Sequence, residues 1–356
     1  MSDKPRTSTR DRDLLRKNLE RWLQPRFGVE AEVREFSAPT SNGMSSDTIL
    51  CTVAAGNTLE SLVVRLAPDA DAVPVFPKYD LAMQFDVMKL VGEQSLVPVP
   101  RMRWYEPDQS PLGAPFLVMD RLDGIVPPDM MPYPFGSWVT EATADERTLM
   151  QNNTVKVLAD LHSIPLSAAT DFLHYQMPGD TPLRRHVADQ RAYYEWVISQ
   201  GPRSPLIERG FEWLDDHWPD EAPAAISWGD SRIGNIMYRD FAPVAVLDWE
   251  MAGIAPREVD IGWLVSMHEF FQSHAGRAGV AGLPDFLQTA DVVHSYHELS
   301  GYEPRQIDWY VAYGALRYAI IGFRIHQRSA HFGEAQMPAN PDDAVMNRDT
   351  LEKHLR

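Results

Sequence analysis

The chain has 356 residues, which is too long for one small hydrophobic core and is typical of two packed lobes or domains. Hydrophobic residues make up 44% and charged residues 23%, which excludes a wholly disordered chain. The formal net charge of −17 disfavours nucleic acid and anionic membranes as partners and would favour cationic ligands and divalent metals, but maintaining solubility is the preferred interpretation because net charge does not locate a site.

The cellular location is indicated by three further features. The apolar stretches are interrupted before the ~20 residues that a membrane span needs. The first residues carry charges and lack the apolar segment of a secretory signal. The single cysteine, Cys51, cannot form an internal disulfide, and its alternating apolar surroundings favour a core position over a nucleophile. We therefore expect a cytoplasmic protein; the sequence does not indicate an oligomeric state.

The first third of the sequence predicts one helix followed by an antiparallel meander. Apolar residues recur at helical spacing within 11–26, and strand-like alternation occurs in 49–53 and 61–66, with Gly56-Asn57 as a turn signal between them. A helix is expected over 79–92, and another strand pair over 101–106 and 115–121. The strands at 49–53 and 61–66 follow each other without a crossover helix, so they form an antiparallel meander and not a βαβ unit.

The remainder of the sequence predicts a mainly helical region. After residue 123 a proline-rich segment is followed by helical patterns over 148–163, 258–272 and 305–328. A strand pair at 235–248, with residues 240–243 as its turn, interrupts them. The fold class is therefore α+β, with a small antiparallel β-sheet lobe, 1–122 including the leading helix, and a larger mainly helical lobe, 123–356.

Three polar residues at fixed spacing carry the clearest chemical signal. Asp230 precedes Asn235 by five positions, and Asp248 follows Asn235 by thirteen, after the apolar run 244–247. Phosphoryl transfer needs a carboxylate that orients the attacking hydroxyl, and oxygen ligands that hold Mg²⁺ against the phosphates. This arrangement supplies both. Taken singly, Asp230 would be more typical of a turn and Asp248 of a strand-end cap; together with Asn235 at this spacing they favour a metal-nucleotide site.

The segments around these residues resemble the aminoglycoside phosphotransferase and choline kinase superfamily. Trp228-Gly229-Asp230-Ser231-Arg232-Ile233-Gly234-Asn235 is similar to its His-Gly-Asp-x-x-x-x-Asn catalytic loop, and Leu247-Asp248-Trp249-Glu250 to its metal-binding segment. Asp260-Ile261-Gly262 resembles the helix start that follows, and 158–162 the Leu-x-x-Leu-His helix. Within the family, the likeness is greatest to actinobacterial phosphotransferases and to the kinase-like domain fused to some acyl-CoA dehydrogenases.

The resemblance implies a two-lobed, protein-kinase-like fold and a set of functional residues. Asp230 would be the catalytic base, and Asn235 and Asp248 would ligate Mg²⁺. The first lobe would bind ATP, or GTP, as the phosphoryl donor. The loop 41–46, with Ser45 and Ser46, would cover the phosphates, and the segment around Met119 would lie under the adenine. Arg65 and Gln84 would bind the phosphates. The second lobe would bind a hydroxylated small molecule as acceptor.

The sequence departs from the family pattern at three positions. Trp228 stands where the catalytic loop has His, a residue that the resemblance makes mainly structural. Arg65 replaces the family's lysine on the third strand and can clamp phosphate oxygens through two N–H groups. The acidic partner on the following helix falls at Gln84 or at Asp86, and an Arg–Gln pair is weaker than Lys–Glu.

Several residues have a structural interpretation beside the functional one. Arg65 lies opposite an apolar strand face, which also fits an ordinary exposed arginine. His162 fits a core histidine, and Asp260 fits a residue that caps a helix or braces the catalytic loop. The aromatic residues around Trp309, Tyr310 and Tyr313 fit either core or a substrate cage.

The favoured function is ATP- and Mg²⁺-dependent phosphorylation of a small-molecule hydroxyl. One alternative is a kinase of a lipid-like or acyl metabolite. The other is a nucleotide-binding pseudokinase, which the Arg65 and Gln84 departures favour and the intact Asp230, Asn235 and Asp248 disfavour.

Overall fold

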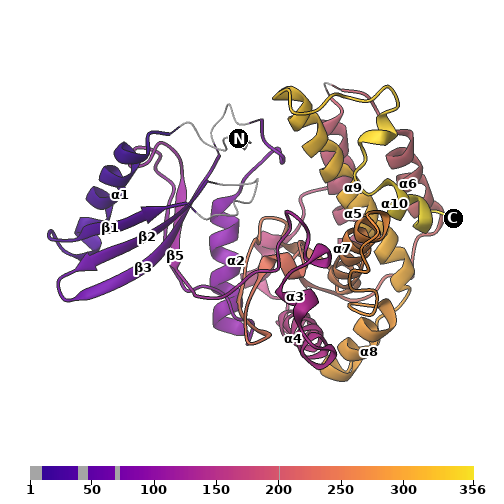
Figure 1. Cartoon of the computed structure of the whole chain (residues 1–356), viewed down its shortest axis with the longest axis horizontal. Coiled ribbons are helices and arrows are strands. Elements are labelled where there is room, and N and C mark those ends of the chain that lie inside the picture. Colours follow the sequence, from indigo (N-terminus) through magenta and orange to yellow (C-terminus); the bar gives the residue numbers. More distant parts are fainter. Residues whose placement is uncertain (1–9, 39–46, 69–72, 200) are drawn as a thin grey trace. The chain divides into compact units, whose positions relative to one another are not determined.

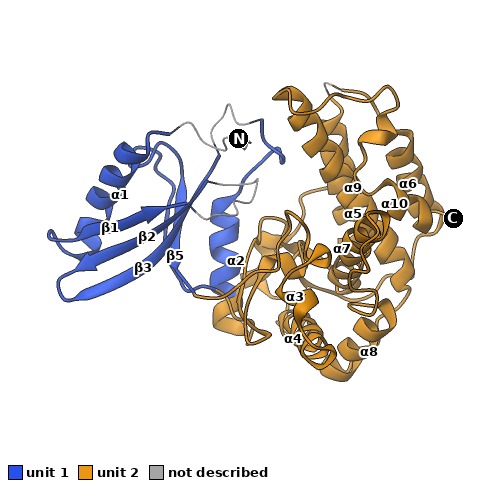
Figure 2. Cartoon of the chain, viewed as in Figure 1, with its two compact units in different colours: residues 1–90, 100–122 blue, residues 91–99, 123–356 orange. Residues whose placement is uncertain are grey.

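The computed structural model describes residues 10–38, 47–68, 73–199 and 201–356 (Figure 1). The chain divides into two compact units (Figure 2). The first comprises the residues up to 90 together with 100–122, and the second comprises 91–99 and 123–356. The segment 91–99 therefore packs with the second unit, although it lies between two parts of the first in the sequence.

The first unit is built on a five-stranded antiparallel sheet with the strand order β1-β2-β3-β5-β4. The predicted meander and leading helix are confirmed, and β1 is an additional strand. The elements are α1 (Arg12–Phe27), β1 (Glu32–Ser37), β2 (Asp47–Ala55), β3 (Thr58–Leu66), α2 (Leu81–Gln94, which runs on into the second unit), β4 (Met102–Glu106) and β5 (Phe116–Asp120).

The core of this unit lies between α1 and one face of the sheet. Asp11 caps α1 by accepting hydrogen bonds from the backbone N–H groups of Asp13 and Leu14, an interaction worth about 1 kcal/mol. The apolar face of α1 packs on the inward side chains of β1, β2, β3 and β5, among them Leu62, Val64 and Leu66. Burial of each such side chain stabilises the unit by roughly 1.5–3 kcal/mol. Strand alternation thus directs Arg65 away from this core.

The second unit is mainly helical. The helices expected over 148–163, 258–272 and 305–328 are confirmed as α4, α7 and α9. Its elements are η1 (Tyr133–Phe135), α3 (Trp138–Glu141), α4 (Ala144–His162), η2 (Ala168–Leu173), α5 (Pro182–Val197), α6 (Pro205–Asp216), β6 (Ala224–Ser227), η3 (Ile233–Asn235), β7 (Ile236–Arg239), β8 (Ala242–Val246), β9 (Gly253–Pro256), α7 (Glu258–Arg277), α8 (Thr289–Ser300), α9 (Ile307–His331), η4 (Pro341–Ala344) and α10 (Arg348–His354).

Helices α7 and α9 form the core of this unit and pack closely against each other. The approach depends on Gly262 of α7, where an added Cβ would lie 2.4 Å from the backbone carbonyl of Tyr310 on α9. A side chain at that position would force the helices apart. This packing fixes the first turn of α7, which carries Asp260, against α9.

The predicted hairpin at 235–248 forms, but its turn is shorter than expected. Only Asp240 and Phe241 form the loop, with φ angles of 50° and 62°, as in the type I′ turn that suits the twist of a two-residue hairpin. Ala242 and Pro243 belong to β8 instead. Proline is tolerated there because the register shifts next to its partner Tyr238, at an irregularity in the ladder.

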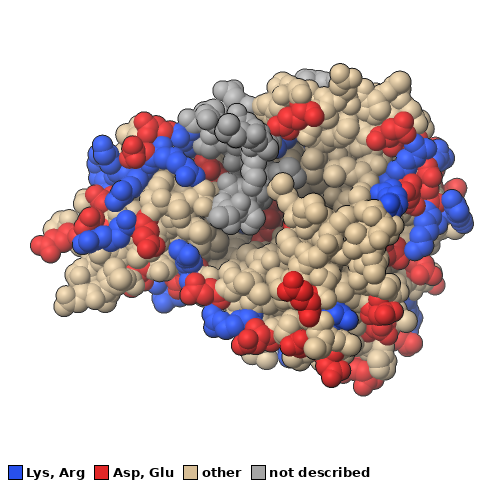
Figure 3. Space-filling model, in the orientation of Figure 1, with Lys and Arg blue, Asp and Glu red and all other residues tan. Residues whose placement is uncertain are grey.

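Charge and hydropathy of the described residues add two observations. No helix within them is long and apolar enough to cross a membrane. On the face drawn in Figure 3, acidic and basic side chains are interspersed over both units. The net acidity of the chain is therefore not gathered in one patch on that face.

Candidate functional site

The loop that carries Asp230 begins where β6 ends. Strand β6 pairs with β9 through Ser227 and Gly253, and the chain then turns at Gly229, which has a φ of 88°. A Cβ at this position would lie 2.0 Å from the carbonyl oxygen of Met251. Only glycine satisfies both the left-handed backbone and this close approach. The glycine of the motif therefore sets the path by which the chain reaches Asp230.

The carboxylate of Asp230 is held by three side chains. The indole N–H of Trp263 donates to Oδ1 at 2.8 Å, and the carboxamide N–H of Asn235 donates to Oδ2 at 2.7 Å. The guanidinium Nε of Arg232 lies 3.1 Å from Oδ1 and 3.2 Å from Oδ2. The Asp230 side chain keeps 14% of its surface exposed. The group is thus oriented by neighbours and still accessible to a ligand.

Asn235 presents one end of its carboxamide to Asp230 and leaves the other for a ligand. Its Nδ2 donates to the Asp230 carboxylate and, at 3.1 Å, to the Asp230 backbone carbonyl, so that Oδ1 is the end able to coordinate a cation. The backbone carbonyl of Asn235 accepts a hydrogen bond from the Leu247 N–H at 2.8 Å. This contact brings Asn235 next to the segment that carries Asp248.

Asp248 lies just beyond its strand in an uncommon backbone conformation. Strand β8 ends at Val246, one residue earlier than the apolar run predicted, and Asp248 has a φ of 61°. Non-glycine residues in this region are uncommon and cluster at functional sites. The amide oxygen of Asn235 and the carboxylate of Asp248 are hard oxygen donors of the kind that Mg²⁺ binds in small number beside phosphate oxygens. The residues present therefore fit this metal.

Trp228, which stands where the resembled motif has His, joins two segments of the site. The side chain is buried, and its indole N–H donates to the backbone carbonyls of Leu247 at 2.9 Å and Asp248 at 3.2 Å. The ring also packs on Trp249, with 5.9 Å between ring centroids. Trp228 thus has a structural role: it fixes the Asp248 segment against the start of the loop that carries Asp230.

Asp260 braces the same loop from the first turn of α7. Its Oδ1 accepts hydrogen bonds from the Ser227 hydroxyl and the Gly229 N–H, both at 2.9 Å. Its Oδ2 accepts from the Trp228 N–H at 2.8 Å and from Nε2 of His162 at 3.1 Å. Burial raises the pKa of this carboxyl, but the donors and His162 outweigh burial, and the net pKa is lowered. Asp260 therefore braces the loop that carries Asp230, which is one of the two structural roles expected from the sequence; the other was helix capping.

Arg232 and Asp129 also belong to the candidate site, although the sequence patterns assign no role to either residue. The Arg232 guanidinium bridges Asp230 to Asp129, which lies in the proline-rich segment before η1. Burial lowers the pKa of Arg232, but the carboxylates of Asp230, Asp129 and Asp248 outweigh burial, so the net pKa is raised. The pairing with Asp129 could not be found by spacing, because 103 positions separate the two residues.

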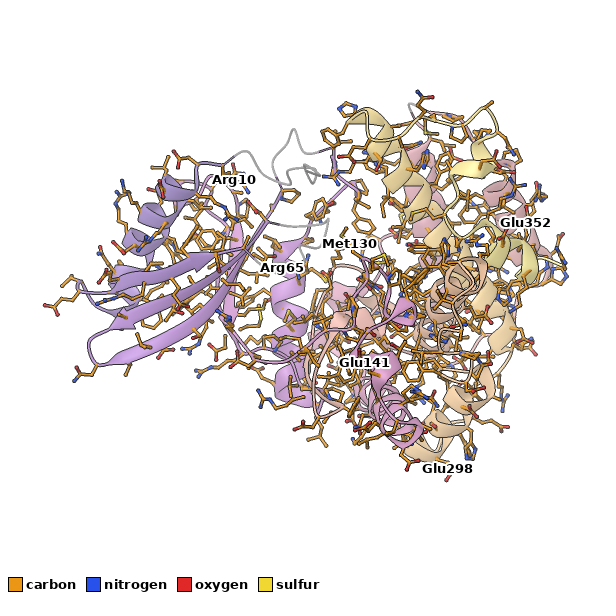
Figure 4. The ribbon with its side chains drawn as sticks, in the orientation of Figure 1. Arg10, Arg65, Met130, Glu141, Glu298 and Glu352 are labelled. Carbon is orange, nitrogen blue, oxygen red and sulfur yellow. The ribbon has the colours of Figure 1, made fainter. Side chains whose placement is uncertain are left out.

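The residues implied for nucleotide binding lie in the first unit. Arg65, labelled in Figure 4, stands in β3 between Thr48 of β2 and Leu117 of β5. Met119 stands in β5, paired with Val63 and Met102.

Gln84 of α2 is buried at 2% exposure, and its Oε1 accepts no hydrogen bond from the described part of the chain. Ser45 and Ser46 lie outside the described residues. The nucleotide roles of these five residues stay predictions.

Three structural expectations are confirmed. Cys51 is fully buried, and burial raises the pKa of its thiol to about 12. His162 is a buried core residue whose Nδ1 contacts the Tyr296 hydroxyl at 2.8 Å. The aromatic residues of α9 belong to the core and not to a substrate cage, because each side chain is at most 4% exposed: Trp309, Tyr310 and Tyr313.

The comparison with known families agrees with this geometry. Residues 38–292, more than half of the chain, match the family model described as phosphotransferase enzyme family. The chain belongs to the phosphotransferase enzyme family. As a member of this family, it is an enzyme of the class that transfers phosphoryl groups. The family match includes every residue of the cluster around Asp230.

Solved structures of phosphotransferases share the fold. One from Ralstonia eutropha, assigned to the aminoglycoside phosphotransferases, is 22% identical, with a TM-score of 0.65 over 95% of this chain and 98% of that one. A thermostable mutant of aminoglycoside phosphotransferase APH(4)-Ia, in a ternary complex with ADP and hygromycin B, is 14% identical, with a TM-score of 0.56 over the same shares. The two units thus have the α+β, kinase-like fold that the sequence predicts.

Sequence relatives of a different length also match. Human acyl-CoA dehydrogenase family member 11 is 27% identical over 244 residues, which are 67% of this chain and 29% of that protein. Across the curated relatives that it matches, the chain spans about a third of their length or less. The match therefore concerns one portion of those proteins.

Proposed function

We propose that this protein transfers the γ-phosphoryl group of ATP, with Mg²⁺, to a hydroxyl group of a small molecule. The observation that carries the proposal is the arrangement of Asp230 and Asn235. The carboxamide of Asn235 donates through Nδ2 to the Asp230 carboxylate at 2.7 Å, and its Oδ1 is left to coordinate a cation. A base and a metal ligand held at one point suit an in-line displacement on a phosphate.

In this proposal Asp230 orients the acceptor hydroxyl and takes up its proton. Trp263 and Asn235 each donate to one oxygen of the Asp230 carboxylate, so its orientation is set before a substrate arrives. Each oxygen has a further acceptor site for the incoming O–H group. Such preorganisation of a general base contributes typically about 10²–10⁴-fold to a rate.

Asn235, through Oδ1, and Asp248 are the proposed magnesium ligands. Bound there, Mg²⁺ would offset negative charge on the β- and γ-phosphates of the nucleotide. Trp228 supports this assignment, because its indole holds the backbone of Asp248 at 3.2 Å and so limits the positions that this carboxylate can take. Arg232 supplies a positive charge beside both carboxylates.

The donor would be held by the first unit through Arg65, Gln84, Met119 and the loop with Ser45 and Ser46. ADP in the ternary complex of APH(4)-Ia, a structure that shares the fold, supports an adenine nucleotide, and GTP remains the other donor to test. The acidic balance of the chain supports a small-molecule acceptor over nucleic acid or a membrane. A cytoplasmic location is part of this proposal.

A lipid-like or acyl metabolite is the second candidate acceptor. The specific observation in its favour is the match to acyl-CoA dehydrogenase family member 11, whose name refers to acyl thioesters. The pseudokinase alternative has less support, because Asp230, Asn235 and Asp248 are all present and Asp230 and Asn235 are joined by a hydrogen bond.

The proposal is tested by measuring phosphoryl transfer with the purified chain. Transfer from γ-labelled ATP would be followed against a panel of aminoglycosides, small alcohols, hydroxy acids and hydroxyacyl thioesters, with and without Mg²⁺. We expect a phosphorylated product with at least one acceptor class, and transfer slower by roughly 10²–10⁴-fold with Asp230→Asn. Tight Mg²⁺-ATP binding without transfer to any acceptor would favour the pseudokinase.

A further inference from the structure

We propose that Trp263 and Arg317 are positioning residues for Asp230, acting together from α7 and α9. The inference rests on the proposed function and deepens it, since it names residues that set the geometry of the base. Neither belongs to the motif that carries Asp230. Trp263 lies in the second turn of α7, and Arg317 lies in the middle of α9.

Trp263 contacts the base directly. Its indole N–H donates to Asp230 Oδ1 at 2.8 Å, while its ring is 1% exposed and packs against Tyr318 with 6.4 Å between ring centroids. A buried indole has one N–H and no alternative hydrogen-bonding role, so its direction is fixed by packing. The ring therefore determines where one oxygen of the Asp230 carboxylate lies.

Arg317 reaches the base by two routes. Its Nη2 donates to the backbone carbonyl of Gly229 at 3.0 Å, one residue before Asp230. Its guanidinium carbon also lies 4.4 Å from the ring centroid of Trp263, within the range of a cation–π contact. Because Asp260 accepts the N–H of Gly229, this glycine is held from both sides. Arg317 thus fixes both the backbone and the indole that orient the carboxylate.

The burial of Arg317 is unfavourable for folding. The side chain is 1% exposed, and among the described residues Nε and Nη1 have no hydrogen-bond partner. Burial raises the pKa of Asp189 in spite of the nearby charge of Arg317, and no salt bridge joins these two side chains in the described part of the chain. A buried arginine with unmatched donors destabilises a fold, and an apolar side chain of similar size is often neutral or stabilising in its place. An arginine that is unfavourable for folding but contacts the loop carrying Asp230 is consistent with a role in activity.

The test compares Arg317→Met, Arg317→Lys and Trp263→Phe with wild type. Arg324→Met is the matched control, because Arg324 lies two turns further along α9 and stacks on Trp196 at 4.6 Å as Arg317 does on Trp263. For Arg317→Met and Trp263→Phe we expect kcat to fall about tenfold to a hundredfold, as a small misplacement of a reacting group does. KM for ATP should change less than about twofold, and Tm of Arg317→Met should be unchanged or higher.

Arg317→Lys should recover part of kcat, since an ammonium can still donate to Gly229 and contact the indole. A second readout needs no turnover: the indole N–H resonance of Trp263, identified by its loss in Trp263→Phe. It should shift in Arg317→Met and stay in place in Arg324→Met.

A purely structural role would appear as a lower Tm with unchanged kcat per folded molecule and an unshifted indole resonance, and would overturn the inference. If Arg317→Met does not fold, wild-type kcat in both Trp263→Phe and Arg317→Lys would overturn it equally. If the wild-type protein did not use ATP, the proposed function would be wrong. The indole N–H resonance of Trp263 would still report whether Arg317 positions the indole.

Discussion

Asp230 and Asp260 are two carboxylates of the same unit that are held in different ways. Asp260 is fully buried and accepts two backbone N–H groups, a hydroxyl and a histidine. Asp230 keeps 14% exposure, and the described residues that donate to its carboxylate do so through side chains: Trp263, Asn235 and Arg232. The backbone donors tie Asp260 to the fold itself, whereas Asp230 is oriented by side chains and keeps part of its surface for a ligand. The comparison separates a buried carboxylate that supports the loop from the carboxylate that we propose as the base.

The largest expected effect is on catalysis at Asp230. Asp230→Asn should lower kcat by roughly 10²–10⁴-fold, because the amide cannot take up the acceptor proton. Its free energy of unfolding should fall by less than that of Asp260→Asn, since Arg232 keeps its ion pair with Asp129 after the Asp230 charge is removed. Initial rates and urea unfolding would measure the two effects. A stability loss as large as that of Asp260→Asn would break the comparison.

Asp260→Asn should have the largest effect on stability. We expect a loss of about 3–5 kcal/mol in the free energy of unfolding, because the amide N–H₂ would face a donor where the carboxylate accepted one. Urea unfolding at pH 7 measures this loss. Ser231→Ala is a milder control, since it removes only a hydroxyl that donates to the Asp260 backbone carbonyl.

The stabilising effect of Asp260 should also depend on pH. The pKa of Asp260 is lowered in the folded protein, so its contribution is fully present above the unfolded pKa of about 3.9 and is lost as pH falls through the lower folded value. The stability difference between wild type and Asp260→Asn should therefore be constant from about pH 5 to 8 and shrink below about pH 4. A difference that grew on acidification would contradict the ionised state assigned to Asp260.

Nucleotide should stabilise the protein through the metal. ATP at ~100 times its dissociation constant would raise the free energy of unfolding by about 2.7 kcal/mol with Mg²⁺ present, and EDTA should remove most of that gain. Differential scanning calorimetry of wild type with ATP and either Mg²⁺ or EDTA measures it. Equal shifts in both conditions would exclude a metal-mediated role for Asn235 and Asp248.

The sequence points to the polar residues of the candidate site in the second unit, but not to the residues that hold them in place. Asp230, Asn235 and Asp248 are close along the chain, so their spacing carries the chemistry. The supports come from far along the chain: Asp129 and Arg317 reach the loop only through tertiary packing, which no local periodicity encodes.

The fold shows the same limit. The long helices and the β2–β3 hairpin follow from local patterns. Short strands such as β6 and β9 have four residues each and exist because they pair with each other across 25 intervening positions, 228–252. The turn at Asp240-Phe241 was predicted too long because strand twist, and not the proline after it, sets the loop length.

The smallest expected effect is on the affinity for ATP when Arg65 of the first unit is replaced. Arg65→Lys should weaken ATP binding, because lysine loses the two-donor fork and Gln84 has no charge to hold an ammonium. Arg65→Lys combined with Gln84→Glu should recover part of the loss. Nucleotide titration of wild type, both single variants and the double variant measures the coupling. If Arg65→Ala bound ATP as tightly as wild type, Arg65 would have no role in binding ATP.

The most direct test of the central claim separates the base from the metal ligands. Isothermal titration of wild type, Asp230→Asn and Asp248→Ala with ATP, each in Mg²⁺ and in EDTA, measures binding without turnover. The account predicts that Asp230→Asn binds Mg²⁺-ATP nearly as wild type does, and that Asp248→Ala in Mg²⁺ binds as weakly as wild type in EDTA. Equal losses in both variants, or wild-type binding that ignores Mg²⁺, would contradict it.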